Sequence, residues 1–283
     1  MSITILSGQI KDLGGFTVAR ILPQVARRML GPFVFLDEMG PAQFAPGTGI
    51  DVRPHPHIGL ATITWLFAGA LGHRDSLGTV IDIYPGAANW MTAGRGISHS
   101  ERTPAAERAA GHLMHGLQAW VALPVSHAEC DPAFDHVSAE AMPRHRADGI
   151  EAVVIAGEMW GLPAPVPFPH PIHYAQVQMQ PGAQLAVPAA WGERGVYLVS
   201  GAVMVDGQAV PRGTLAVLGQ GDAVIGASEP SLLMLLGGAP FPEKRHLEWN
   251  FVSHDPARIA AAVADWRADR FAAVPGESER IPY

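Results

Sequence analysis

The sequence predicts an all-β protein made of two tandem β-barrels, with one C-terminal helix packed on the barrels. Its composition is 48% hydrophobic and only 16% charged, with 31 Gly and 25 Pro, which favours many short strands joined by turns. A pattern of strand and turn in the first half recurs in the second half, as in Gly69-Ala70-Leu71-Gly72 and Gly201-Ala202-Val203. A helical repeat of apolar residues occurs only near the C-terminus.

The first barrel is expected within residues 1–130. Gly14-Gly15 indicates a hairpin turn, and apolar stretches separated by turn residues predict strands at 31–38, 61–68, 79–84 and 117–123. Thr103 and Pro104 resemble a helix start, with Gly111 as its stop; an extended loop over residues 103–116 is the alternative.

The stretch from Pro54 to Glu101 carries the candidate chemistry. Alternate residues of a strand project to one face, so His55 and His57 point together, as do His99 and Glu101. If these two strands are neighbours in a closed barrel, three imidazoles and one carboxylate converge, and such donors suit a borderline divalent metal. Chance occurrence is the alternative explanation for the His-x-His pair in a chain with 13 His, and a solvated strand face is the alternative for the His-x-Glu pair.

The residues between the two pairs are too apolar for a surface loop. Trp65, Phe67, Trp90 and Met91 are candidates for an apolar pocket lining, and core packing is the alternative for each. His73 and Asp75 fall in a predicted hairpin turn, where we expect them to be solvated.

The second barrel is expected within residues 131–283, after a polar, Pro-containing connection over 127–149. It has no His-x-His pair: the equivalent place is taken as 188–194, so its metal-binding capacity is lost. Asp255 and Pro256 predict a helix start, and apolar residues at i, i+4 and i+7 predict that helix 256–271 docks through Ile259, Val263 and Trp266.

Charge and targeting patterns exclude several classes of protein. The net charge is −7 and no Lys/Arg cluster interrupts it, which argues against direct nucleic-acid binding. No apolar run approaches the length of a membrane span and the start does not look like a signal peptide, so no membrane contact and a cytoplasmic location are expected. Cys130 is the only cysteine, which rules out an intrachain disulfide and fits a reducing compartment.

Longer motifs give the chain a family resemblance. The segments 54–59, 90–101 and 115–120, with 218–222 and 249–253 in the second half, resemble the pirin family of the cupin superfamily, over essentially the whole chain. The resemblance implies a bicupin with one mononuclear divalent metal in the N-terminal barrel. The implied ligands are His55, His57, His99 and Glu101. Iron is the expected metal, and zinc, nickel, copper and manganese are the alternatives.

The resemblance implies two different functions. Some pirins resemble quercetinases, which implies a quercetin 2,3-dioxygenase acting on an aromatic or phenolic substrate with O2, and Glu101 is then a candidate base as well as a ligand. The alternative is a metal-dependent, redox-sensing regulator that binds a protein partner without physiological turnover, as pirins of animal cells act with transcription regulators. A structural metal that only rigidifies the barrel is a third reading.

Overall fold

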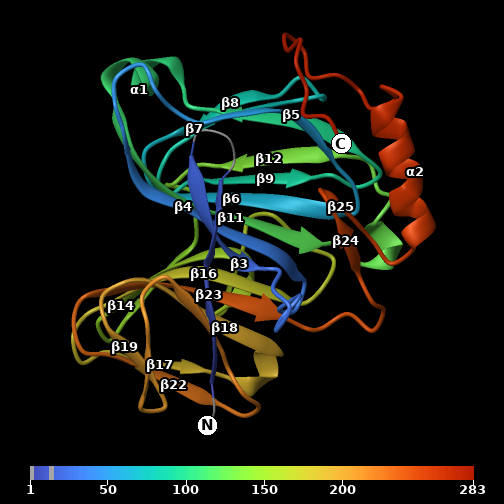
Figure 1. Cartoon of the computed structure of the whole chain (residues 1–283). Coiled ribbons are helices and arrows are strands. Elements are labelled where there is room, and N and C mark those ends of the chain that lie inside the picture. The colour runs from blue at the N-terminus through green and yellow to red at the C-terminus, as the bar shows by residue number, and fades with distance from the viewer. Residues whose placement is uncertain (1–2, 13–15) are drawn as a thin grey trace. The chain divides into compact units, whose positions relative to one another are not determined.

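The computed structural model describes residues 3–12 and 16–283 (Figure 1). By its contacts the chain divides into two compact units. One unit comprises Ile10–Ala19, Val34–Ala139 and Pro242–Tyr283, and the other comprises Met1–Gln9, Arg20–Phe33 and Glu140–Phe241. The predicted Gly14-Gly15 turn lies outside the described residues.

The first of these units contains the predicted N-terminal barrel. Its larger sheet has the order β12(Ala133–Val137)-β9(Ala88–Thr92)-β6(Leu60–Ala68)-β11(His112–Ala122)-β4(Phe33–Phe44)-β3(Thr17–Leu22)-β2(Gln9–Asp12). Its smaller sheet has the order β5(Asp51–His57)-β10(Ile97–Arg102)-β7(Leu71–Asp75)-β8(Val80–Ile83). The remaining elements are α1(Ala105–Ala110), η1(Val125–His127), the pair β24(His246–Glu248) and β25(Phe251–Ser253), and α2(Pro256–Arg267).

The second unit is also built from two sheets. The larger has the order β1(Thr4–Ser7)-β21(Thr214–Val217)-β18(Glu193–Ser200)-β23(Ser231–Gly238)-β16(Ile172–Met179)-β14(Ile150–Met159)-β13(Arg144–Ala147), with β15(Leu162–Pro163) paired to β14. The smaller has the order β17(Gln184–Val187)-β22(Ala223–Ala227)-β19(Val203–Val205)-β20(Gln208–Val210), and η2(Ala189–Trp191) precedes β18. Its core consists mainly of buried Val, Leu, Ile and Ala side chains.

The strand order of the two units repeats, which confirms the predicted tandem of two barrels. The order β5-β10-β7-β8 in one unit matches β17-β22-β19-β20 in the other, and β9-β6-β11-β4 matches β21-β18-β23-β16. The strand that corresponds to the His-x-His strand is therefore β17, so the equivalence placed at 188–194 was wrong by several residues. Neither β17 nor β22 contains a histidine or an acidic residue.

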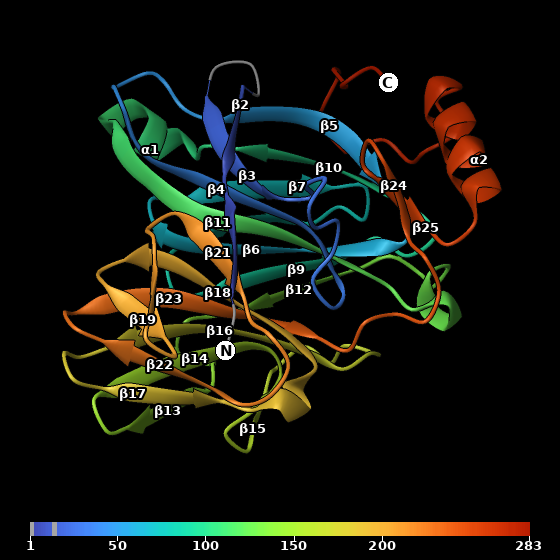
Figure 2. The same ribbon diagram turned by 60° about the horizontal axis from the view of Figure 1, so that its bottom comes forward.

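Helix α2 begins as predicted, because the Asp255 side chain accepts a hydrogen bond from the Ala257 amide and Pro256 occupies the first turn. It ends at Arg267, four residues before the predicted end. Its buried face consists of Ile259, Ala262 and Trp266, packed with Ile58 and Phe251, while Val263 is only partly buried. Figures 1 and 2 show α2 beside β24 and β25.

The predicted domain ranges, 1–130 and 131–283, differ from the contact division at both ends: residues 3–9 and 20–33 fall in the second unit, and residues 131–139 and 242–283 fall in the first. Within the first unit, α2 packs on Phe251 of β25 and on Ile58. In the described part of the chain no helix is long and apolar enough to cross a bilayer.

The helix expected after Thr103 is short. It spans Ala105–Ala110 and ends at Gly111, but its first residues carry no side-chain cap. The Thr103 hydroxyl instead accepts a hydrogen bond from the Ile50 amide at 2.8 Å, so it ties the end of β10 to the start of β5.

Truncation of Ile259 tests the docking of α2. Ile259→Ala removes a side chain that is 3% exposed and should destabilise the protein by about 2–5 kcal/mol. Ala260→Ser, at an exposed position of the same helix, should change stability by less than about 0.5 kcal/mol. Urea unfolding followed by tryptophan fluorescence measures both, and equal midpoints for the two variants would show that the helix does not dock through this face.

Candidate metal centre

Strand β10 lies between β5 and β7 in the smaller sheet of the N-terminal barrel. His99 on β10 is directly opposite His55 on β5 and Asp75 on β7. Residues that face each other across an antiparallel pair project to the same side of the sheet. The pairing therefore brings the two predicted histidine strands together, with the imidazoles of His55, His57 and His99 on the buried side.

These three histidines form a compact cluster. All three are buried, and one ligand nitrogen from each lies within 4.8 Å of the others. The Nε2 atoms of His57 and His99 are 3.0 Å apart. No other set of three or more His, Cys, Asp or Glu with this geometry occurs among residues 3–12 and 16–283.

Backbone carbonyls determine which nitrogens of His55 and His57 carry protons. His55 Nδ1 lies 2.9 Å from the Arg53 carbonyl oxygen, and His57 Nδ1 lies 3.2 Å from the Asn250 carbonyl oxygen. A carbonyl oxygen only accepts, so each Nδ1 donates its hydrogen and each neutral ring keeps its lone pair on Nε2. Both lone pairs are thus available to a cation.

Tight packing holds Asn250 against His57. The β25 residue Phe251 bridges to Ile58, and the Val252 amide donates to the Ile58 carbonyl oxygen at 3.1 Å. Gly59 has a φ of 66°, and a Cβ there would lie 2.0 Å from the Val252 carbonyl oxygen. Only glycine permits this close approach of the two backbones.

The arrangement fits a divalent cation. With metal–nitrogen bonds of about 2.1 Å, two nitrogens at a right angle are about 3.0 Å apart, which is the separation observed between His57 and His99. Imidazole nitrogen is a common ligand for iron, nickel, copper and zinc. His55, His57 and His99 are therefore the residues that would hold a metal.

The electrostatics of the cluster favour uncharged rings. Burial lowers the pKa of His55 to about 4, and it lowers the pKa of His57 well below the ordinary value, reinforced by repulsion from His55. The pKa of His99 is lowered in the same way, by burial first and then by its histidine neighbours. At neutral pH the three rings are therefore uncharged, so a second ring proton competes weakly with a metal.

Glu101, the predicted fourth ligand, lies on β10 two residues after His99. Its carboxylate is not part of the compact group formed by the three histidines. A shift of register between β10 and β5 occurs between His99 and Glu101, so that Glu101 is opposite Val52. Burial raises the pKa of Glu101 to about 7. Its ligand role stays a prediction.

Trp120 is an aromatic neighbour of the cluster that was not among the lining candidates, and three of those candidates follow the alternative, core packing. Trp120 on β11 contacts His57 edge-on, with ring centroids 4.9 Å apart, and stacks on Phe35 at 3.9 Å. Trp65, Trp90 and Met91 are buried in the core, whereas Phe67 is only partly buried and packs edge-on against His115. Sequence reasoning placed Trp120 in a family motif but gave it no role at the site.

His73 and Asp75 were predicted to be solvated, and this was wrong. They lie on β7 rather than in the turn that follows, with side chains buried beside the cluster: His73 is 6% and Asp75 0% exposed. His73 stacks on Phe134, with ring centroids 4.4 Å apart, and lies against His99. The signal that could have found them is the alternation of His73 and Asp75, the same spacing as in the two recognised pairs.

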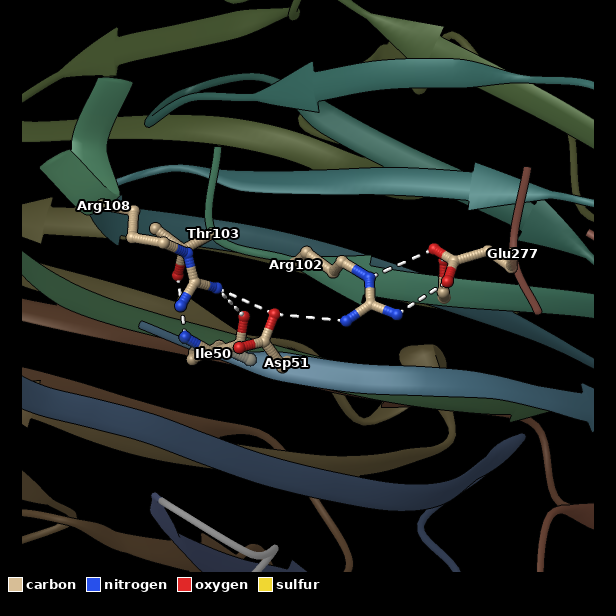
Figure 3. Close-up of polar contacts among 7 residues, drawn as sticks. Ile50, Asp51, Arg102, Thr103, Arg108 and Glu277 are labelled. Carbon is tan, nitrogen blue, oxygen red and sulfur yellow. Dashed lines mark hydrogen bonds and ion pairs between the residues drawn. The ribbon is translucent and has the colours of Figure 1, made fainter. Parts of the chain in front are cut away.

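The opposite face of β10 is held by the C-terminal segment (Figure 3). Glu277 accepts hydrogen bonds from the Ser100 hydroxyl at 3.0 Å and from Arg102 Nε and Nη2 at 3.1 and 2.7 Å. Asp51 at the start of β5 accepts from Arg102 and from Arg108, as Figure 3 also shows. The strand that carries His99 is thus fixed from both sides.

The comparisons with known proteins agree with this geometry. Residues 15–121 match the family profile described as Pirin, and residues 174–272 match the profile described as Pirin C-terminal cupin domain. A pirin-like protein of Caulobacter vibrioides is 49% identical over 92% of this chain and 91% of its own length.

Two solved structures show the same fold. The crystal structure of quercetin 2,3-dioxygenase from Acinetobacter baumannii has a TM-score of 0.92 and 33% identity, covering 99% of this chain and 94% of that one. The bacterial pirin YhhW from Escherichia coli, crystallised in complex with nickel(II), has a TM-score of 0.66 and 17% identity, covering 85% of this chain and 100% of that one.

Two repeated barrels, with three clustered histidines in the first of them, define a protein of the bicupin class. Within that class, the two profile matches and the 49% identity show that the chain belongs to the pirin family.

Removal of the Glu277 charge tests how the C-terminal segment is attached. Glu277→Gln weakens the ion pair with Arg102, whose side chain is one-third exposed. The free energy that holds the C-terminal segment in place should fall by about 1 kcal/mol. Tryptic cleavage after Arg280 should then become about fivefold faster. Glu279→Gln, at an exposed neighbouring position, should leave the cleavage rate unchanged. Equal rates for both variants would show that the ion pair does not hold the segment.

The same attachment should depend on pH. The hydrogen bonds from Arg102 lower the pKa of Glu277 below its ordinary value of 4.5. Their stabilisation is therefore complete above pH 4.5 and is lost as the pH falls through the lowered pKa. The NMR signal of the Trp266 indole N–H, which donates to the Ile281 carbonyl oxygen, measures this loss when it is followed on acidification in wild type and in Glu277→Gln.

Proposed function

We propose that this protein is a quercetin 2,3-dioxygenase-type oxidoreductase, which cleaves a flavonol or a similar enolic or phenolic substrate with O2 at one divalent metal. The observation that carries the proposal is the set of three buried imidazoles, two of them with lone pairs fixed by backbone carbonyls. Its scaffold is 33% identical to a quercetin 2,3-dioxygenase over nearly the whole chain. A bound metal would supply Lewis-acid and redox chemistry to this site.

The residues of the chain would bind and orient the substrate. We assign Glu101, two residues after His99 on β10, the roles of fourth ligand and of the group that accepts the proton of the substrate hydroxyl. A pKa of about 7 suits a carboxylate base that works near neutral pH. Trp120 provides an aromatic surface against His57, on which a flat ring can pack.

Iron is proposed as the metal, with nickel, copper, manganese and zinc as alternatives. A location in the reducing cytoplasm, which the single Cys130 suits, would keep iron in its ferrous form. Elemental analysis of the protein as isolated distinguishes these metals. Zinc as the main component would favour a structural role, because zinc does not change its oxidation state.

Metal binding is expected at one ion per chain and should require the histidine cluster. His57→Ala removes one ligand and should lower the metal content of the purified protein to background. His127→Ala alters an exposed histidine and should leave the metal content unchanged. Equal metal content in the two variants, measured by elemental analysis, would contradict the assignment of the site.

Turnover should depend on both the metal and Glu101. Iron-loaded protein is expected to consume quercetin under air, followed by the loss of its absorbance, and treatment with a chelator should abolish the reaction. Glu101→Gln should lower kcat by roughly 10²–10⁴-fold, because it removes the proton acceptor. If fully metal-loaded wild type consumes neither quercetin nor other flavonols under air, the dioxygenase proposal is wrong and the regulator reading replaces it.

A further inference from the structure

A continuous line of polar contacts leads from the histidine cluster to Asp75. His99 Nε2 faces His57 Nε2 at 3.0 Å, while His99 Nδ1 lies 3.4 Å from His73 Nδ1. The other nitrogen of His73, Nε2, lies 2.9 Å from Asp75 Oδ2. All four residues are buried, so the order of protons along this line is set by the protein itself.

The line ends in a group that only accepts hydrogen bonds. Burial would by itself raise the pKa of Asp75, but hydrogen bonds from His73 and Thr79 outweigh it, and the pKa lies below its ordinary value. Asp75 is therefore a carboxylate at neutral pH. Its Oδ1 accepts from the amides of Leu77 and Thr79 at 2.9 and 3.1 Å, which leaves Oδ2 for His73.

The position of each ring proton along this line follows from the Asp75 carboxylate. Because Asp75 accepts, His73 donates from Nε2, and in the neutral form of the ring the lone pair then lies on Nδ1. His99 must then donate from Nδ1 to His73, which leaves the lone pair of His99 on Nε2. That lone pair points toward His57 Nε2, whose own lone pair is fixed by the Asn250 carbonyl oxygen.

We propose that His73 and Asp75 are positioning residues that fix His99 in the tautomer and orientation able to bind the metal. His99 is the cluster member whose Nδ1 has a histidine, rather than a backbone carbonyl, as its hydrogen-bond partner. A histidine can donate or accept, so only the carboxylate behind it decides the direction. This inference rests on the metal-binding part of the proposed function and is independent of the substrate.

Asp75→Asn should reverse the direction of the hydrogen bonds from residue 75 through His73 to His99, with little change in side-chain shape. The amide oxygen of Asn can keep the two backbone amides, which turns its NH2 group toward His73 Nε2. His73 must then carry its proton on Nδ1 and donate it to His99, whose remaining proton moves to Nε2 and occupies the metal-binding position. Metal affinity should fall by about 10–100-fold, as for loss of an outer hydrogen-bond partner of a metal ligand.

The first test uses the metal-free protein. With ¹⁵N-labelled histidine, long-range ¹H–¹⁵N NMR distinguishes protonated from unprotonated ring nitrogens. Wild-type His99 should show an unprotonated Nε2, and Asp75→Asn should show a protonated one. The same His99 tautomer in both proteins would overturn the inference, whatever metal the protein binds.

The second test measures affinity for Co²⁺ by competition with a chelator, together with its visible absorption spectrum. Asp75→Asn should bind 10–100-fold more weakly than wild type. Ser76→Ala, next to Asp75, is the matched control, because it removes only the hydroxyl that accepts from the Ser98 amide at 3.2 Å and should leave the affinity unchanged. If both variants bind Co²⁺ equally weakly, the structure of the turn, and not the order of protons, determines the affinity.

A double variant separates proton order from general damage. His73→Leu removes the polar link between Asp75 and His99, so Asp75→Asn should cost less than threefold in this background. Full additivity of the two substitutions would overturn the inference. Absence of Co²⁺ binding by wild type would refute the proposed function instead, and the NMR comparison would still decide the inference.

Discussion

Lone pairs aimed at one point repel each other, and the N-terminal barrel holds three imidazoles against that repulsion. His57 and His99 approach to 3.0 Å, and burial lowers the pKa of both rings, so neither is a charged imidazolium at neutral pH. A cation relieves the repulsion. The pairing of β10 with β5 and β7, the Asn250 carbonyl and the Glu277 ion pair all hold rings or strands in an arrangement that is unfavourable without one.

Much of this centre could be predicted from the sequence, because strand alternation is a local rule. It placed His55 with His57 and His99 with Glu101, and the family motif joined the two pairs. His73 and Asp75 obey the same rule, but a neighbouring Gly-rich turn made a solvated hairpin the simpler interpretation. The contact of Asn250 with His57 spans 193 residues, and no local pattern encodes such a distance.

The fold was predictable for a similar reason. Composition and turn residues indicated many short strands, and the repeat of strand and turn indicated two barrels, which the repeated strand order confirms. The surface on which α2 packs was not predictable, because an apolar stripe shows that a helix packs on another surface but does not identify that surface. Ile58 and Phe251, which receive it, are apolar residues of no distinctive pattern. The strands β17 and β22 keep the barrel shape with small and aliphatic residues, which pack without needing a metal.

The close approach of residues 250–252 to His57 and Gly59 has a consequence for biosynthesis. The ribosome delivers the three histidines long before it delivers Asn250, so a nascent chain carrying the whole first barrel still lacks the acceptor for His57 Nδ1. The histidine cluster therefore gains its last backbone acceptor only after residue 250 has been added. A premature stop codon before that point would leave a product in which no backbone carbonyl fixes the tautomer of His57.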